Sequence, residues 1–318
     1  MKTNNLIRLS AILVILLGLI FTGCTKKSTT DQTSSNTSSL QQLSIDETNL
    51  ENNSDEAMND ANAVLSPGGL LKSSELLPCN ATIDSALVLN DTLIIYIRYH
   101  GLTCAGKKSI TGNIEVRKNV HTNWHDPGAT VYVTFIDFKV TRVATQKSMT
   151  FNGTKTFVNV SGGYIWQLGY QVDALIHRVT GVIQVTFDDN TTKSWNIAKQ
   201  RTLTRVVNGS IAHLLLTIDG LGSADGYNNL VVWGVNRNNE NFYAQITQLV
   251  IVKEACDWDP CCGIEVFQIP AAHKSATVTF GYDSNNNQLP CTGDECPTRY
   301  KVDWTVNNQS GTFYLPLH

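Results

Sequence analysis

The sequence predicts an all-β protein, most simply an antiparallel β-sandwich with two related β-rich halves after a disordered tether. Three observations lead to this prediction. From residue 70 onward, apolar and polar residues alternate with a period of two, which is typical of half-buried strands. Clusters of Asn, Asp, Gly and Ser separate these segments and indicate hairpin turns. No segment of the mature chain shows a convincing amphipathic helical pattern, and only 166–177 is ambiguous.

The expected strands follow one another from residue 92 to residue 315, and the clearest alternation lies at 130–141. The full set is 92–99, 109–116, 130–141, 149–151, 157–160, 181–187, 194–197, 203–207, 214–218, 230–235, 242–252, 265–269, 276–280, 300–306 and 312–315. Turns are expected at 152–153, 161–163, 188–190, 208–209 and 283–287. We expect one β-rich domain at 70–207, followed at 208–318 by a second domain or by a continuation of the same sheet system.

The segment before the first strands has a different composition. From Thr25 to about Pro67 the chain is rich in Ser, Thr, Asn, Gln and acidic residues and poor in aromatic residues. Such a segment buries too little apolar surface to offset the entropy lost on ordering, so we expect it to be disordered. A flexible tether of this length has a root-mean-square reach of about 35 Å. Together with Cys24, the predicted tether covers 24–69.

Charge and motifs exclude some classes of function. The formal net charge is −3, the acidic excess lies before residue 67, and no basic stripe follows, so we expect no nucleic-acid partner. The chain contains no G-x-S-x-G, no H-E-x-x-H and no phosphate-binding glycine loop. We therefore expect a non-enzyme with no catalytic residue and no cofactor. A glycoside hydrolase stays open as an alternative, because it needs only two carboxylates without a local motif.

The first 23 residues have the pattern of an export signal. Lys2 and Arg8 precede the apolar run 11–21, and small residues at 22–23 precede Cys24. The apolar run is shorter than the roughly 20 residues of a membrane-spanning helix. The segment resembles a lipoprotein signal with its lipobox at 21–24. This resemblance implies that the signal peptide 1–23 is cleaved and that Cys24 carries acyl chains such as palmitate, which anchor the protein in a membrane.

The remaining cysteines are candidates for disulfides, since an exported chain meets an oxidising compartment. They are Cys79, Cys104, Cys256, Cys261, Cys262, Cys291 and Cys296. A faint internal repeat relates 93–116 to 276–306 and would make Cys79–Cys104 and Cys256–Cys291 equivalent bonds. Cys296 would then pair with Cys261 or Cys262, and one thiol would stay free.

Metal and ligand sites are weakly indicated. We expect no metal site: the cysteine spacing is poor for zinc, and His121 and His125 fall in a predicted turn. Trp195, Trp233 and Trp304 lie in strand patterns and should be core residues. Trp124 and Trp166 fall in expected loops and are the candidate ligand-binding residues.

The strand-and-turn patterns after about residue 75, such as 110–114, 150–154 and 277–281, resemble a group of β-rich lipoproteins of the Bacteroidota type. The resemblance implies a fold and a cell-envelope location but no chemistry. We expect an outer-membrane lipoprotein, with the periplasm-facing side slightly favoured over the cell surface. The first hypothesis is a non-catalytic binding or structural role toward an unknown ligand. The alternative is a carbohydrate-binding or adhesin-like surface module with a glycan or protein partner.

Overall fold

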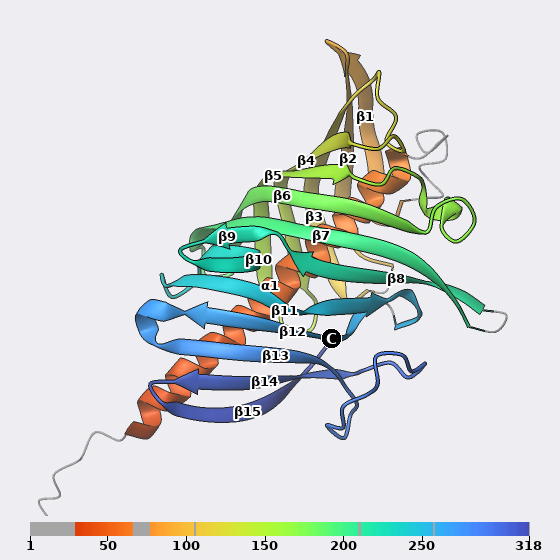
Figure 1. Ribbon diagram of the computed structural model, residues 1–318. Helices are drawn as coiled ribbons and strands as arrows, with labels where there is room; N and C mark the ends of the chain where they lie inside the picture. Colours follow the sequence, from red (N-terminus) through yellow and green to blue (C-terminus); the bar gives the residue numbers. More distant parts are fainter. Residues whose placement is uncertain (1–28, 66–76, 105, 209–210, 257, 318) are drawn as a thin grey trace, which may run out of the picture.

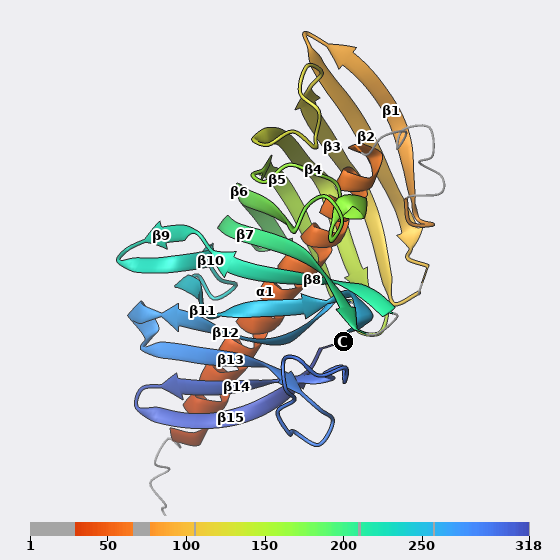
Figure 2. The ribbon, with the colours of Figure 1, turned by 45° about the vertical axis from the view of Figure 1, so that its right-hand side comes forward.

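The computed structural model describes residues 29–65, 77–104, 106–208, 211–256 and 258–317. Within them, one long helix, α1 (Thr29–Leu65), lies against a single antiparallel sheet of 15 strands. The sheet curves around α1, which crosses it diagonally (Figure 1, Figure 2). In this part of the chain, no helical segment combines the length and the hydropathy that a membrane span requires.

The strands and short helical turns have the following bounds. They are β1 (Ala81–Leu89), β2 (Thr92–Leu102), β3 (Lys108–Asn119), β4 (Ala129–Arg142), β5 (Ser148–Asn159), η1 (Ile165–Gln167), β6 (Ala174–Phe187), β7 (Thr192–Asn208), β8 (Ile211–Gly220), β9 (Gly222–Ala224), β10 (Tyr227–Val235), β11 (Asn241–Lys253), η2 (Glu254–Cys256), β12 (Asp259–Ile269), η3 (Pro270–Ala272), β13 (Lys274–Tyr282), β14 (Arg299–Val306) and β15 (Gln309–Pro316).

The sheet is largely an up-and-down meander, with one branch in its middle. Strands β1 to β7 and β10 to β15 follow one another, and β9 pairs with β10. Strand β7 pairs with β10 through residues 195–197 and with β8 through residues 199–208. β7 can pair with both strands because β10 and β8 bind to successive stretches of it. β7 crosses the predicted boundary at 207/208 and pairs with β8 beyond it, so the two predicted β-rich segments share one sheet.

Helix α1 overturns two predictions: the disordered tether over 24–69, for the residues that the helix includes, and the absence of a helix from the mature chain. Most of its buried apolar side chains recur at spacings of three, four or seven residues: Leu40, Leu43, Leu50, Ala57, Ala61 and Val64. The pattern is weak in the sequence because polar side chains share the buried positions. Those of Asp46, Glu47, Asn53 and Ser54 are at most 4% exposed.

Basic side chains from the sheet compensate the buried acids of α1. Lys199 on β7 is fully buried, contacts the Glu51 carboxylate, and lies 3.2 Å from both carboxylate oxygens of Asp55. Lys155 on β5, also fully buried, donates to Ser54 Oγ at 2.6 Å. Loss of water lowers the pKa of Lys199 to about 7 and that of Lys155 to about 8.

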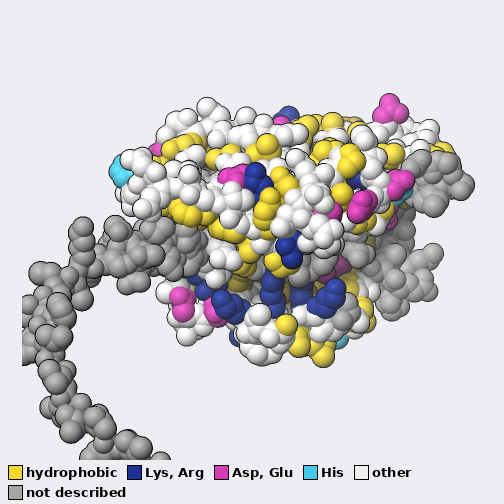
Figure 3. Space-filling view, turned by 90° about the horizontal axis from the view of Figure 1, so that it is seen from below, with side chains coloured by type: hydrophobic (Ala, Val, Ile, Leu, Met, Phe, Trp, Pro, Cys, Tyr) yellow, Lys and Arg dark blue, Asp and Glu magenta, His cyan; other side chains and the backbone are white. Residues whose placement is uncertain are grey.

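Further basic groups hold the helix along its length. Arg237 donates to both carboxylate oxygens of Asp46, at 2.5 and 3.0 Å. Arg142 on β4 donates to Asn49 Oδ1 at 2.6 Å. Seen from below, Lys and Arg side chains gather on one part of the molecule (Figure 3). The acidic composition that indicated a solvated tether therefore belongs to a helix whose largely buried acidic side chains pair with Lys and Arg side chains from the sheet and its loops.

The all-β, antiparallel prediction is confirmed, but the sheet does not stack on a second sheet as in a sandwich. Helix α1 takes the place of the second layer. The largest buried side chains lie on inward-facing strand positions and pack around it: Trp195, Phe135, Phe138, Phe151, Phe157, Phe242 and Phe267. A curved sheet needs one apolar face, and the alternation of its strands supplies it.

Three disulfides are present among the described residues: Cys79–Cys104, Cys256–Cys296 and Cys262–Cys291. The first confirms its prediction. The predicted Cys256–Cys291 bond is wrong, and so is the pairing of Cys296 with Cys261 or Cys262. Cys261 keeps a free, buried thiol. The repeat misled because spacing along the chain does not fix pairing, whereas the fold brings Cys256 of η2 within 5.3 Å, Cα to Cα, of Cys296 in the segment between β13 and β14.

Candidate functional site

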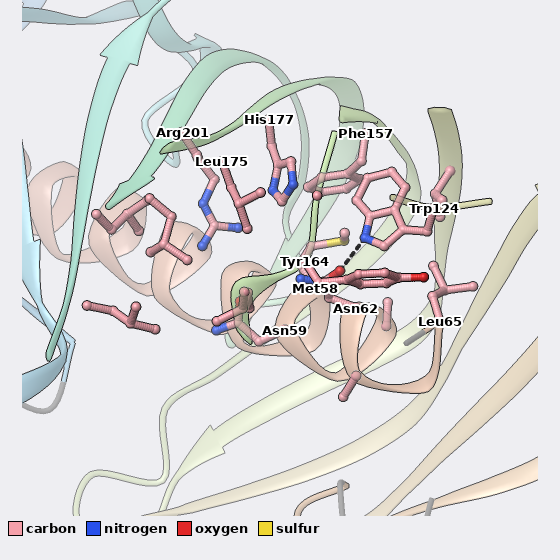
Figure 4. A pocket seen from close by; sticks show the side chains of 18 of the residues that line it. Met58, Asn59, Asn62, Leu65, Trp124, Phe157, Tyr164, Leu175, His177 and Arg201 are labelled. Atoms are coloured by element: carbon pink, nitrogen blue, oxygen red, sulfur yellow. Dashed lines mark hydrogen bonds between the residues drawn. The ribbon is translucent and has the colours of Figure 1, made fainter. Parts of the chain in front are cut away.

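A cavity of about 330 Å³ lies between the C-terminal part of α1 and the inner face of the sheet (Figure 4). Strands β4 to β8, the residues just before and within η1, and Trp258 complete its walls. Its volume falls in the range of ordinary small-molecule pockets, about 300–1,000 Å³. It is the candidate functional site.

Inward-facing strand residues form the apolar part of the cavity. Phe157 on β5, Leu175 on β6 and Leu203 on β7 line it, and Met58 faces it from α1. Leu175 and Leu203 are directly opposite each other in the β6–β7 pair. The period of two places each side chain on the concave face, and the next inward position on each strand is polar.

Those next positions are His177 and Arg201, which are also directly opposite each other and line the cavity. The Nε2 atom of His177 is buried and has no hydrogen-bond partner among the described residues. Burial, and to a lesser degree the charge of Arg201, lowers the pKa of His177 to about 4, so the imidazole is neutral at pH 7.

Arg201 is 12% exposed, and its guanidinium is only loosely paired. Its Nε lies 3.7 Å from Asp55 Oδ2, beyond hydrogen-bond reach, and has no other partner in the described chain. The charge is therefore partly balanced by Asp55, while the buried Nε–H group has no acceptor among the described residues.

Trp124 forms a wall of the cavity and is not exposed, at 6% of its surface. Its Nε1 donates to Asn62 Oδ1 on α1, as the dashed line in Figure 4 shows. Its ring lies 5.3 Å from that of His177, centroid to centroid. Trp124 therefore lies in a loop, as expected, and lines the cavity as a buried side chain, and its role in ligand binding stays a prediction.

Asn159, at the end of β5, joins the two loops beside the cavity. It is fully buried, donates to the Trp124 carbonyl at 2.9 Å, and accepts from the Gly162 N–H at 2.9 Å. Gly162 and Gly163 have φ values of 72° and 92°, which favour glycine. The Gly163 N–H donates to the His125 carbonyl at 2.8 Å. The predicted turn at 161–163 is thus confirmed and packs on the loop that carries Trp124.

Aromatic side chains surround the mouth of the cavity. Trp166 is 64% exposed and stacks on Tyr164, with ring centroids 5.8 Å apart and an interplanar angle of 15°. The Tyr164 hydroxyl is hydrogen-bonded to His125 Nδ1 at 2.5 Å. Trp258, 40% exposed, lines the cavity from the segment before β12. Single exposed aromatics are common, but these three converge on one opening.

Sequence reasoning missed most of the polar residues of the site. His177 stood alone in the sequence, and Arg201 and the α1 residues carried no motif. Strand register places His177 and Arg201 opposite each other. The only sequence signal for this pair would have been a full alternation pattern over β6 and β7 that put both residues on the inner face. The His121/His125 segment is a turn as predicted, and no metal-binding group of side chains occurs among the described residues. Cys24 lies outside them.

Comparison with known proteins gives no relative: no family model, no curated protein and no solved structure matches the chain. The site must be interpreted from its own chemistry. That chemistry is an apolar cavity with an aromatic mouth and a small polar end.

Proposed function

We propose that the protein is a non-catalytic binding protein of the cell envelope, which holds a small, largely apolar molecule between α1 and strands β5 to β8. The cavity carries this proposal. An apolar space of this size with a few convergent polar groups is the usual form of a small-molecule site. Flat aromatic side chains at its mouth add contact area at low entropic cost.

The proposal keeps the lipid anchor predicted at Cys24 and an outer-membrane location, with the periplasm-facing side favoured over the cell surface. Helix α1 changes one part of it. Because α1 begins at Thr29, five residues after Cys24, the folded part would stand close to the membrane instead of about 35 Å away on a flexible tether.

The test is a titration of the purified full-length protein with N-phenyl-1-naphthylamine, a neutral dye that fluoresces in apolar surroundings. Ala63 lines the cavity from α1, so Ala63→Phe should fill it and weaken dye binding at least about tenfold, which is about 1.4 kcal/mol. Tyr132→Phe, at an exposed position on β4, is the control and should bind as the wild type does. Equal binding by all three proteins, or no binding by any, would refute the proposal.

A carbohydrate-binding function is the second candidate, and the exposed Trp166 stacked on Tyr164 favours it. Such faces bind sugar rings through C–H groups and would need no deep cavity. Under this candidate, Trp166→Ala abolishes glycan binding on an array, whereas Ala63→Phe leaves it unchanged. Under the first candidate, Ala63→Phe has the larger effect.

The glycoside hydrolase alternative gains no support from this site. The described residues that line the cavity include His177 and Arg201 but no Asp or Glu. The pair of carboxylates that such an enzyme needs would have to lie elsewhere.

A further inference from the structure

Some polar atoms of the cavity already have a hydrogen-bond partner within the protein, and others have none among the described residues. Asn62 Oδ1 accepts from Trp124 Nε1, and the Tyr164 hydroxyl is hydrogen-bonded to a histidine nitrogen 2.5 Å away. His177 Nε2 and Arg201 Nε are buried without a hydrogen-bond partner in the described chain. Arg201 Nε always carries a proton and needs an acceptor, and His177 Nε2 needs one in the tautomer that has its proton there.

The two side chains that carry these nitrogens are cross-strand neighbours. His177 and Arg201 are directly opposite each other on β6 and β7, and both side chains point from the sheet toward α1 (Figure 4). Side chains in such a pair have Cβ atoms about 5 Å apart. A single functional group with two acceptor atoms can reach both.

We propose that the ligand is a small monocarboxylate with a flat apolar body. Its carboxylate accepts hydrogen bonds from His177 Nε2 and from the Arg201 guanidinium, and its body lies against Trp124 and extends toward Trp166 at the mouth. This inference rests on the proposed function, because it names the ligand class of the same cavity.

The charge of the site favours a single carboxylate over other groups. A carboxylate matches the planar guanidinium geometrically and forms charge-assisted hydrogen bonds with it. Arg201 is the only Arg or Lys among the described lining residues, and Asp55 balances its charge only in part, so the site suits at most one further negative charge. An amine would be repelled by Arg201. A primary amide offers only one acceptor oxygen and brings two donors toward groups that are donors themselves.

The histidine takes part as a neutral donor. In the free protein the imidazole is uncharged at pH 7, and the tautomer with a proton on Nε2 can donate to the carboxylate. The groups that face it are Arg201 from β7 and the Trp124 ring, with Asp55 of α1 beyond Arg201. Arg201 therefore supplies the charge, and His177 orients the carboxylate.

The experiment compares two probes of the same shape, 2-naphthoate and 2-naphthamide, by calorimetric titration of the full-length protein. The measured quantity is the ratio of their affinities, which is insensitive to small changes in folding. We expect the carboxylate to bind at least tenfold more tightly in the wild type. In Arg201→Gln the ratio should fall to about one, and in His177→Gln and Arg201→Lys it should fall severalfold.

Arg205→Gln is the matched control. Arg205 lies on the same strand, stacks on the exposed Tyr170 ring 4.4 Å away, and does not line the cavity, so its variant should keep the wild-type ratio. Equal affinities of the two probes in the wild type would overturn this inference but leave the binding function standing. A ratio that Arg201→Gln does not change would also overturn it. Binding of neither probe would overturn both proposals.

Discussion

Replacing Lys199 by methionine should lower the free energy of unfolding by about 3–5 kcal/mol, because it leaves buried carboxylates without their partner. The Lys199 side chain is 0% exposed, contacts Glu51, and lies 3.2 Å from both oxygens of Asp55. Glu265 and Glu47 also face it, and burial raises the pKa of both carboxyl groups. The intact pair contributes little net stability, but its loss is costly, since desolvation is then uncompensated.

The assay is urea unfolding followed by circular dichroism and by tryptophan fluorescence. Lys301→Met is the matched control: Lys301 pairs with Asp303 at 2.8 Å, but the two side chains are 27% and 40% exposed. A surface pair of this kind contributes about 0–1 kcal/mol. The double variant Lys199→Met/Glu51→Gln should recover part of the loss, because it removes one of the stranded charges.

This reasoning would be refuted if Lys199→Met lowered the free energy of unfolding as little as Lys301→Met does. It would mean that the acidic residues of α1 are not held against β7, and that the segment 29–65 behaves as the solvated tether that its composition indicates. A large cost without any recovery in the double variant would locate the effect in packing instead of in charge.

Three further predictions concern pH, a loop and the cysteines. The unfolded His177 gains a proton as the pH falls below 6.5, whereas burial keeps the folded one neutral down to about 4. The wild type should therefore lose about 3 kcal/mol more unfolding free energy than His177→Gln between pH 7 and pH 4, and parallel pH profiles would contradict this. Asn159→Ala should lower the free energy of unfolding by about 1–3 kcal/mol, because it leaves buried backbone groups unpaired. An unchanged melting temperature would show that Asn159 does not hold the two loops together. Peptide mapping without reduction should recover Cys262 linked to Cys291, with Cys261 alkylated only after unfolding, and a Cys261 disulfide would contradict the structure.

The strands were predictable wherever one of their faces is buried. The alternation at 130–141 matches β4 almost in full, because each inward residue is buried and each outward residue is more exposed. β1 was missed because it is exposed over most of its length and shows no alternation. The expected turn at 152–153 is wrong: Gly153, with φ 133°, lies inside β5, where the partner strand β4 has a register shift between Phe135 and Phe138. A local turn signal cannot be distinguished from a bulge without the partner strand.

By itself, the sequence determined the antiparallel, all-β character and most of the strands, because these depend on local periodicity. The internal repeat predicted the Cys79–Cys104 bond but gave Cys256 the wrong partner. Only the tertiary structure decided that the acidic segment is a helix and that His177 and Arg201 meet in a cavity. Asp55 is bound by Lys199, 144 residues further along the chain. The physical reason is that a buried charge is acceptable only beside its partner, and composition cannot show a partner that folding brings from so far away.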